Sequence, residues 1–312
     1  MEICLKISKD INEKYNKILG LDDEDVYIPI YESKKFKKDT LIMSGGGISG
    51  ISFIGSLKAL EIKNILKDIT TFAGTSMGAL ILSLYVIGYA PDKILQIIQL
   101  LNFEKLGSLT ITNLINHYGL DTGKNIEYLL KKLIIGRGYK EDITLKELFD
   151  STNKKLIITT VCLNTMEVCY ISHETHPNIS LHKAIRMSIS IPIFFTPVEH
   201  DGDLYIDGGC IDNYPIHIFK DRVDNVIGVF ISGDSGISRQ IDNIETYIVQ
   251  IIKCINFGFD FQTFKGYENN TVMINIENIG FMNFNINKED KEYMFNEGFF
   301  ETIKFLNKIK VE

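Results

Sequence analysis

The pattern of hydrophobic and polar positions changes sharply at Thr40. Residues 1–39 are polar and rich in charge, with an acidic run at 22–25 and four lysines around Phe36. This composition is typical of a solvated segment, with contact between the basic cluster and anionic lipid as the alternative. We therefore expect a polar N-terminal extension at residues 1–40 and one folded domain at residues 41–312.

From Thr40 onward, short apolar runs alternate with longer segments whose apolar residues have helical spacing. The apolar runs predict strands at residues 40–44, 69–73, 156–163, 167–172, 203–206, 226–231 and 271–276. The helical spacing predicts helices at residues 51–64, 79–89, 91–101, 122–135 (capped by Asp121), 180–190, 241–264 and 288–309. Strands that alternate with helices predict an α/β fold, with three α/β/α layers and a mostly parallel central sheet.

Composition narrows the class of protein. The net charge of −7 and the pI of about 5.5 argue against a nucleic-acid partner, because neutralising phosphates requires a clustered excess of Lys and Arg. The five cysteines are widely spaced without a CxxC pair, which indicates neither a disulfide framework nor a zinc site. No signal-peptide pattern is visible at residues 1–9, and the longest apolar run is too short to span a bilayer. We expect a cytoplasmic protein that contacts membranes only peripherally.

The sequence Gly74-Thr75-Ser76-Met77-Gly78 has the GxSxG pattern of a nucleophilic serine. A predicted strand precedes it and an apolar helix follows it, which is the structural context that the pattern requires. Gly74 and Gly78 have no side chain, so a sharp turn can close and a substrate can approach Ser76. An inert serine in a small-residue turn is the alternative.

A second glycine-rich loop, GGGISG at residues 45–50, lies between the first predicted strand and helix. Its spacing satisfies the GxGxxG pattern of a dinucleotide site, but that site also needs an acidic residue at the end of the second strand. Ser76 follows that strand instead. The alternative is that backbone N–H groups of the loop stabilise the oxyanion of a tetrahedral intermediate.

A nucleophilic serine needs a base. The histidine of an α/β-hydrolase triad comes late in the chain, whereas the last histidine here is His217 and 95 residues follow it (312 − 217). Asp207 is the other candidate, because it follows a predicted strand and precedes Gly208 and Gly209 in a turn. An aspartate has an unperturbed pKa of about 3.9, which makes it a weak base near neutral pH. If Asp207 is the base, we therefore expect a desolvated pocket to raise its pKa.

Four segments together resemble the patatin-like phospholipases and occur in that family's order. They are SGGGISGISFIGSLKALE (44–61), GTSMG (74–78), AIRMSISIPIFFTPV (184–198) and DGGCIDNYP (207–215). The resemblance covers about residues 41–216 and implies a patatin-like fold that acts as a serine lipid acyl hydrolase. It implies phospholipid or lysophospholipid acyl esters as substrates, met at a peripheral membrane surface.

The resemblance also assigns site residues. It implies Ser76 as the nucleophile and Asp207 as the base of a Ser–Asp dyad, with Gly45, Gly46 and Gly47 as the oxyanion loop. Gly74, Gly78, Gly208 and Gly209 support these motifs, and no metal or organic cofactor is implied.

The chain departs from the family pattern at Ser49, where members commonly carry Arg or Lys. This departure bears on anionic headgroup binding and on the stability of the glycine loop. Two rival functions stay open. One is a nucleotide-binding oxidoreductase that uses Gly45, Gly47 and Gly50, and the other is a catalytically weak lipid-binding or regulatory protein on the same fold.

Overall fold

The computed structural model describes residues 38–103, 107, 109–232, 241, 247, 250–251, 265–277, 279–280 and 283–309. The chain divides into two compact units, Met1–Phe36 and Lys37–Glu312, and every element below belongs to the second unit. Nearly all of the expected extension at residues 1–40, and most of the helix expected at 241–264, lie outside the described residues.

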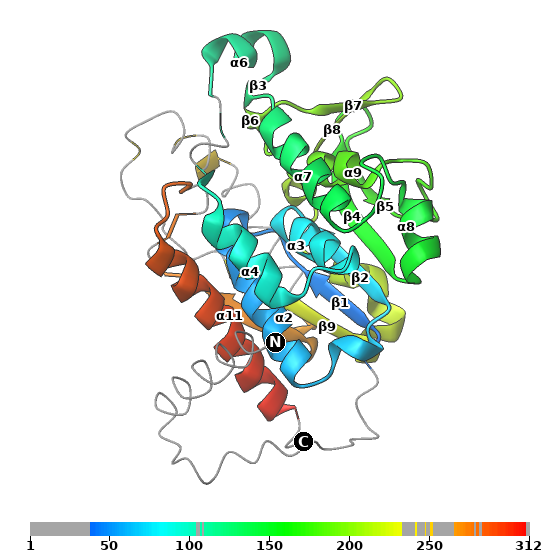
Figure 1. Ribbon diagram of the computed structural model, residues 1–312, viewed down its shortest axis with the longest axis vertical. Coiled ribbons are helices and arrows are strands. Elements are labelled where there is room, and N and C mark those ends of the chain that lie inside the picture. The colour runs from blue at the N-terminus through cyan, green and yellow to red at the C-terminus, as the bar shows by residue number, and fades with distance from the viewer. Residues whose placement is uncertain are drawn as a thin grey trace. The chain divides into compact units, whose positions relative to one another are not determined.

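One large sheet forms the centre of this unit (Figure 1). Its strands, in spatial order, are β10 (Thr271–Asn275), β9 (Val226–Ser232), β1 (Thr40–Met43), β2 (Thr71–Thr75), β4 (Lys155–Cys162), β8 (Asp203–Asp207) and β7 (Val198–His200). The first five strands are parallel, β8 is antiparallel to β4, and β7 is antiparallel to β8. Strand β5 (Glu167–Ile171) also pairs with β4. The prediction of an α/β fold with a mostly parallel sheet is confirmed.

The helices connect and cover these strands. The α-helices are α2 (Ser52–Ile62), α3 (Met77–Val86), α4 (Pro91–Leu100), α6 (Ile111–His117), α7 (Lys124–Gly136), α8 (Leu145–Thr152), α9 (Leu181–Ser188) and α11 (Lys288–Lys308). The 3-10 segments are η1 (Gly47–Ile51), η2 (Leu66–Asp68), η3 (Gly208–Cys210), η4 (Pro215–Asn225) and η5 (Glu268–Asn270). A second, two-stranded sheet joins β3 (Gly119–Asp121) to β6 (Ile193–Phe195) in parallel.

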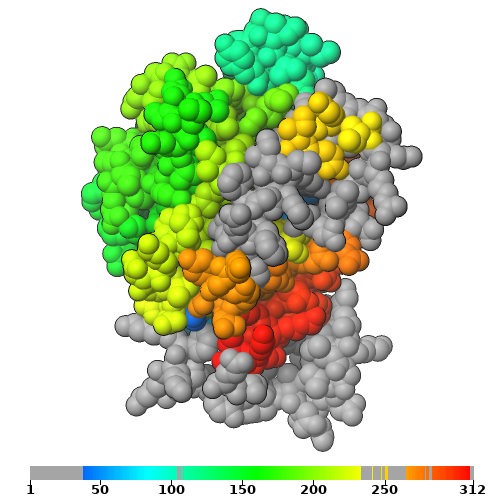
Figure 2. Space-filling model, turned by 180° about the vertical axis from the view of Figure 1, so that it is seen from behind, coloured from blue at the N-terminus to red at the C-terminus, as the bar shows by residue number. Residues whose placement is uncertain are grey.

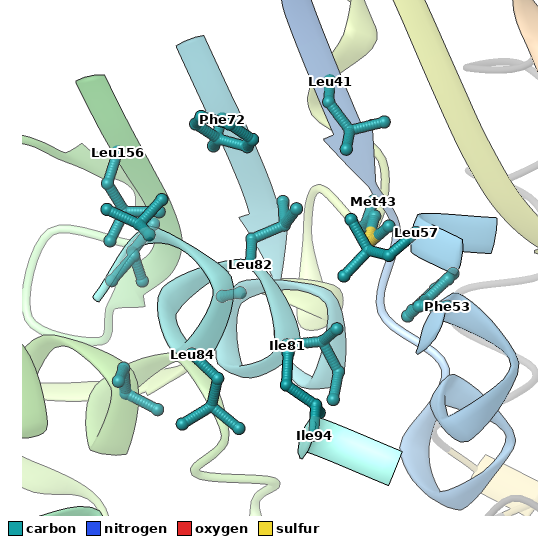
Figure 3. Close-up of a cluster of buried hydrophobic side chains, with 14 of the residues drawn as sticks. Leu41, Met43, Phe53, Leu57, Phe72, Ile81, Leu82, Leu84, Ile94 and Leu156 are labelled. Carbon is teal, nitrogen blue, oxygen red and sulfur yellow. The ribbon is translucent and has the colours of Figure 1, made fainter. Parts of the chain in front are cut away.

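The strand period of two places alternate side chains on opposite faces of the sheet. Leu41 and Met43 of β1 point to the face covered by α2, α3 and α4 and belong to the same buried cluster as Phe53, Leu57 and Ile81 (Figure 3). Ile42, between them, belongs to a separate cluster on the other face, together with Tyr214 and Ile216 of the η4 region. The apolar run at residues 41–43 of β1 follows from this, because both faces of the strand are buried.

Two details of the predicted elements are wrong. Helix α7 starts at Lys124 after Gly123, and Asp121 is not its capping residue; instead, Asp121 Oδ1 accepts a hydrogen bond of 2.6 Å from the N–H of Gly123. The loop expected at residues 45–50 becomes helical at Gly47, where η1 begins. In both places a local hydrogen-bonded turn replaces the geometry that the sequence pattern suggests.

Strand register places the candidate nucleophile and base at one edge of the sheet. Thr75 of β2 is opposite Thr159 of β4, and Thr160 of β4 is opposite Asp207 of β8. Ser76 directly follows Thr75, so it lies at the level of Asp207 with only β4 between their strands. The carboxyl ends of β1 and β2 meet at this edge because the two strands are parallel and in register.

Candidate active site

Ser76 occupies the turn between β2 and α3. Its backbone angles are φ 51° and ψ −121°, a region that residues with a side chain rarely adopt and that stores about 1–3 kcal/mol of strain. The surrounding structure holds this turn in place. The Ser76 N–H donates to Ser188 Oγ at 2.9 Å, and Ser188 Oγ donates in turn to the carbonyl of Thr159 at 2.6 Å.

The two glycines of the GTSMG motif permit close packing of backbones. A Cβ on Gly78 would lie 2.4 Å from the carbonyl oxygen of Ser44, and a Cβ on Gly74 would lie 2.7 Å from the nitrogen of Ala79. Both neighbours are backbone atoms and cannot move aside as a flexible side chain can. The structure therefore requires glycine at both positions to form this turn.

Asp207 lies beside Ser76 although 131 residues separate them. Ser76 Oγ donates a hydrogen bond of 2.6 Å to Asp207 Oδ2, and the Gly209 N–H donates one of 2.7 Å to Asp207 Oδ1. Burial raises the pKa of Asp207 to about 7, whereas both hydrogen bonds oppose this shift. The carboxylate thus has the raised pKa that a general base near neutral pH requires.

The predicted oxyanion glycines divide into two groups. The Gly45 N–H donates to the carbonyl of Asn213 at 2.9 Å, so it is already engaged. Gly45 nevertheless lies close to Ser76, because a Cβ on Gly45 would lie 3.5 Å from Ser76 Cβ. Gly46 is the N-terminal residue flanking η1, and Gly47, with a φ of 50°, lines the same cavity as Ser76. N–H groups at the start of a helix have no partner within that helix.

Ser49, where the family commonly carries a basic residue, is buried with 1% of its surface exposed. Its Oγ has no hydrogen-bond partner among the described residues. The side chain of Ser49 therefore points into the protein.

The DGG turn after β8 is supported by a second buried carboxylate. A Cβ on Gly208 would lie 2.5 Å from the carbonyl oxygen of Thr159, so this glycine also permits close approach. Asp212 accepts a hydrogen bond of 2.7 Å from Tyr170 Oη, and its own carbonyl accepts one of 3.2 Å from Thr75 Oγ1. Asp212 thereby connects the DGG turn to the residue that precedes Ser76.

An apolar cavity of about 110 Å³ opens beside Ser76. Among the described residues that line it, Ser76 is the one with a hydroxyl, none carries a charge, and Gly47 also contributes. The other lining residues are Met77, Leu80, Leu84, Ile97, Ile98, Leu101, Phe103, Ile126, Leu129, Leu130, Leu133, Ile189, Ile191, Phe195 and Phe284. A cavity of this composition suits a hydrocarbon chain, because apolar groups are favourably transferred into it from water.

Several site residues were not singled out from the sequence. Ser188 and Asn213 both lie inside segments that resemble the family, so a signal for them was present. The cavity residues of α4 and α7 were recognised only as parts of amphipathic helices. A helical face that lines a cavity and one that packs in a core have the same sequence period.

Within the described residues, no three His, Cys, Asp or Glu side chains lie close enough together to hold a metal ion. Among the helices that the structure describes, none is long and apolar enough to cross a membrane.

Fold and site together define an α/β protein with a serine on a strand–turn–helix elbow, hydrogen-bonded to a buried aspartate beside an apolar cavity. A family model for patatin-like phospholipases matches residues 41–220. The chain belongs to the patatin-like phospholipase family.

Two viral proteins and one solved structure are similar to this chain. An uncharacterized protein of Acanthamoeba polyphaga mimivirus is 32% identical over 271 residues, covering 83% of this chain and 90% of that protein. A probable lipid hydrolase of Invertebrate iridescent virus 6 is 34% identical over 184 residues, covering 57% of this chain and 62% of the viral protein. The crystal structure of VipD from Legionella pneumophila has a TM-score of 0.58 at 18% identity, covering 87% of this chain and 67% of VipD, and shows the shared fold. Membership of the patatin-like phospholipase family supports lipid hydrolase activity.

Proposed function

We propose that the protein is a serine lipid acyl hydrolase that cleaves fatty acyl esters of phospholipids or lysophospholipids through a Ser76–Asp207 dyad. The observation that carries the proposal is the 2.6 Å hydrogen bond from Ser76 Oγ to Asp207 Oδ2. Ser76 also lines an apolar cavity, so a lipid acyl ester bound there would meet the hydroxyl. Membership of the patatin-like phospholipase family supports this choice of substrate.

In the proposed reaction, Ser76 Oγ attacks the ester carbonyl carbon while its proton passes to Asp207 Oδ2. The tetrahedral intermediate collapses, and the leaving alcohol takes the proton from Asp207, which leaves an acyl-enzyme on Ser76. Water then attacks the acyl carbon, again giving a proton to Asp207, and the fatty acid leaves as Ser76 Oγ recovers the proton. A base with a pKa of about 7 suits both transfers, because it can accept and return a proton near neutral pH.

The Gly46 and Gly47 N–H groups are the proposed donors to the oxyanion. Gly46 directly precedes η1 and Gly47 begins it and lines the same cavity as Ser76, whereas the Gly45 N–H is engaged by Asn213. Each donor to an oxyanion typically lowers the barrier by about 3 kcal/mol. In this proposal Gly45 instead lets the loop pack against Asn213, since a Cβ on Gly45 would lie 2.2 Å from Asn213 Oδ1.

The test is release of free fatty acid from phospholipid vesicles and from lysophospholipid micelles, without added metal. We expect Ser76→Ala and Asp207→Asn each to lower the rate at least about 1000-fold, because each removes one half of the dyad. Ser232→Ala is a matched control, because Ser232 is a serine at the end of β9 whose hydroxyl donates to the carbonyl of Ile274.

Circular dichroism would establish that each variant is folded. Near-full activity in either dyad variant would refute the dyad. A folded wild-type protein that releases no fatty acid, and whose Ser76 is not labelled by a fluorophosphonate, would instead favour a lipid-binding or regulatory role.

A further inference from the structure

Helix α6 and the residues beside it expose large apolar side chains. Ile111 and Ile115 are each 72% exposed, Tyr118 is 66% exposed and Leu109 is 45% exposed. The four-residue spacing of Ile111 and Ile115 places both on one face of the helix. No residue of α6 is buried, and the segment is visible from both sides of the molecule (teal, Figures 1 and 2).

This segment also lacks charge. Residues 107–120 contain no Asp, Glu, Lys or Arg, although such residues make up 23% of the whole chain. An uncharged, apolar surface cannot form ion pairs with an acidic or basic partner. It favours an apolar environment, and Tyr118 is of the type that prefers the boundary between lipid and water.

The exposed face is connected to the cavity beside Ser76. Helix α6 packs on β3, which pairs with β6, and Phe195 of β6 lines the cavity. Two segments that line the cavity also expose apolar side chains. Leu100, which is 86% exposed, precedes cavity-lining Leu101, and Ile193, which is 39% exposed, lies in β6 with cavity-lining Phe195. The apolar lining of the cavity and the apolar exposed surface therefore belong to the same pieces of chain.

We propose that α6 and its flanking residues form the surface that inserts into the facing leaflet of a neutral lipid bilayer and brings the cavity to its substrate. This inference rests on the proposed lipid hydrolase function. Continuity with the cavity favours lipid over a protein partner, because the segments that expose apolar side chains also connect to the lining of the cavity beside Ser76. The absence of charge implies that zwitterionic lipid suffices and that salt has little effect on binding.

The first test uses the lack of tryptophan in this chain. Ile115→Trp creates a single fluorescent reporter on α6, and Ile62→Trp creates a control on α2. Helix α2 links the parallel strands β1 and β2, so Ile62 at its end lies at the opposite edge of the sheet from Ser76. Both proteins also carry Ser76→Ala to prevent hydrolysis. With phosphatidylcholine vesicles, we expect the tryptophan emission to shift to the blue in the Ile115→Trp protein and to stay unchanged in the Ile62→Trp protein.

The second test compares the double variant Ile111→Ser/Ile115→Ser with Ile62→Ser. We expect the double variant to bind phosphatidylcholine vesicles at least about tenfold more weakly, because two inserted side chains are lost. Hydrolysis of a short, water-soluble ester should be unchanged in both variants. Vesicle binding that survives in the double variant, falls equally in Ile62→Ser, or disappears at high salt would overturn the proposal.

Two outcomes separate this proposal from its alternatives. A wild-type protein that ignores vesicles but forms dimers lost in the double variant would show that α6 binds a second copy, and would overturn the lipid assignment. A blue shift in the Ile115→Trp protein, combined with a wild type that hydrolyses neither soluble nor vesicle esters, would refute the proposed catalysis and support the membrane contact.

Discussion

Replacing Asp207 with Asn should stabilise the protein at alkaline pH while abolishing its activity. Asp207 is 4% exposed, and burial raises its pKa from 3.8 to about 7. The folded chain therefore holds this proton more tightly than the unfolded chain does, so stability is lost as the pH rises towards 7. An asparagine at this position would stay neutral and could still accept the hydrogen bond from Gly209 and donate one to Ser76 Oγ.

The size of the effect follows from the pKa shift. Each pH unit between pH 5 and the folded-state pKa of about 7 lowers the free energy of unfolding of the wild type by about 1.4 kcal/mol. The stability of Asp207→Asn relative to the wild type should therefore increase by about 3 kcal/mol between pH 5 and pH 8.5. Above pH 7 the difference should be constant, because Asp207 is then ionised in both states.

Urea unfolding of both proteins at pH 5, 7 and 8.5 measures this difference. Ser76→Ala provides an opposite control, because it removes a donor to the ionised carboxylate and should become less stable relative to the wild type as the pH rises. The reasoning would be refuted by a stability difference for Asp207→Asn that is independent of pH, or by one that favours the wild type at pH 8.5.

Two further predictions concern the pH profile and the elbow. For hydrolysis of a water-soluble ester, kcat/KM should increase with pH and level off above about 7, because Asp207 must be ionised to accept the proton; a rate that is flat from pH 5 to 9 would contradict this. Gly78→Ala should lose about 3 kcal/mol of stability in urea unfolding, because its Cβ would meet backbone oxygens at 2.4 and 2.5 Å. Gly280→Ala, whose nearest contact is 3.8 Å, should be nearly neutral, and equal effects would argue against the close packing.

Much of the fold could be predicted from local pattern. The strands of the parallel sheet and helices α2, α3, α4, α9 and α11 were expected within a few residues, because long apolar runs and sustained helical spacing are strong signals. The elements that were missed are short. Strands β3, β6 and β7 have three residues each, α6 has seven and α8 has eight, too few for a periodic pattern to be recognised.

Neighbouring residues in the sequence define three features of the site: a serine between two glycines after a buried strand, a glycine-rich loop after another strand, and an aspartate before a pair of glycines. Those are properties of neighbouring residues. Tertiary packing places β4 between the strands of Ser76 and Asp207, in a register that brings Ser76 Oγ within 2.6 Å of Asp207 Oδ2. It also decided that Asn213 engages Gly45 and that Asp207 is desolvated. These outcomes depend on contacts between residues far apart in the chain, and no local pattern records which atoms will surround a carboxylate after folding.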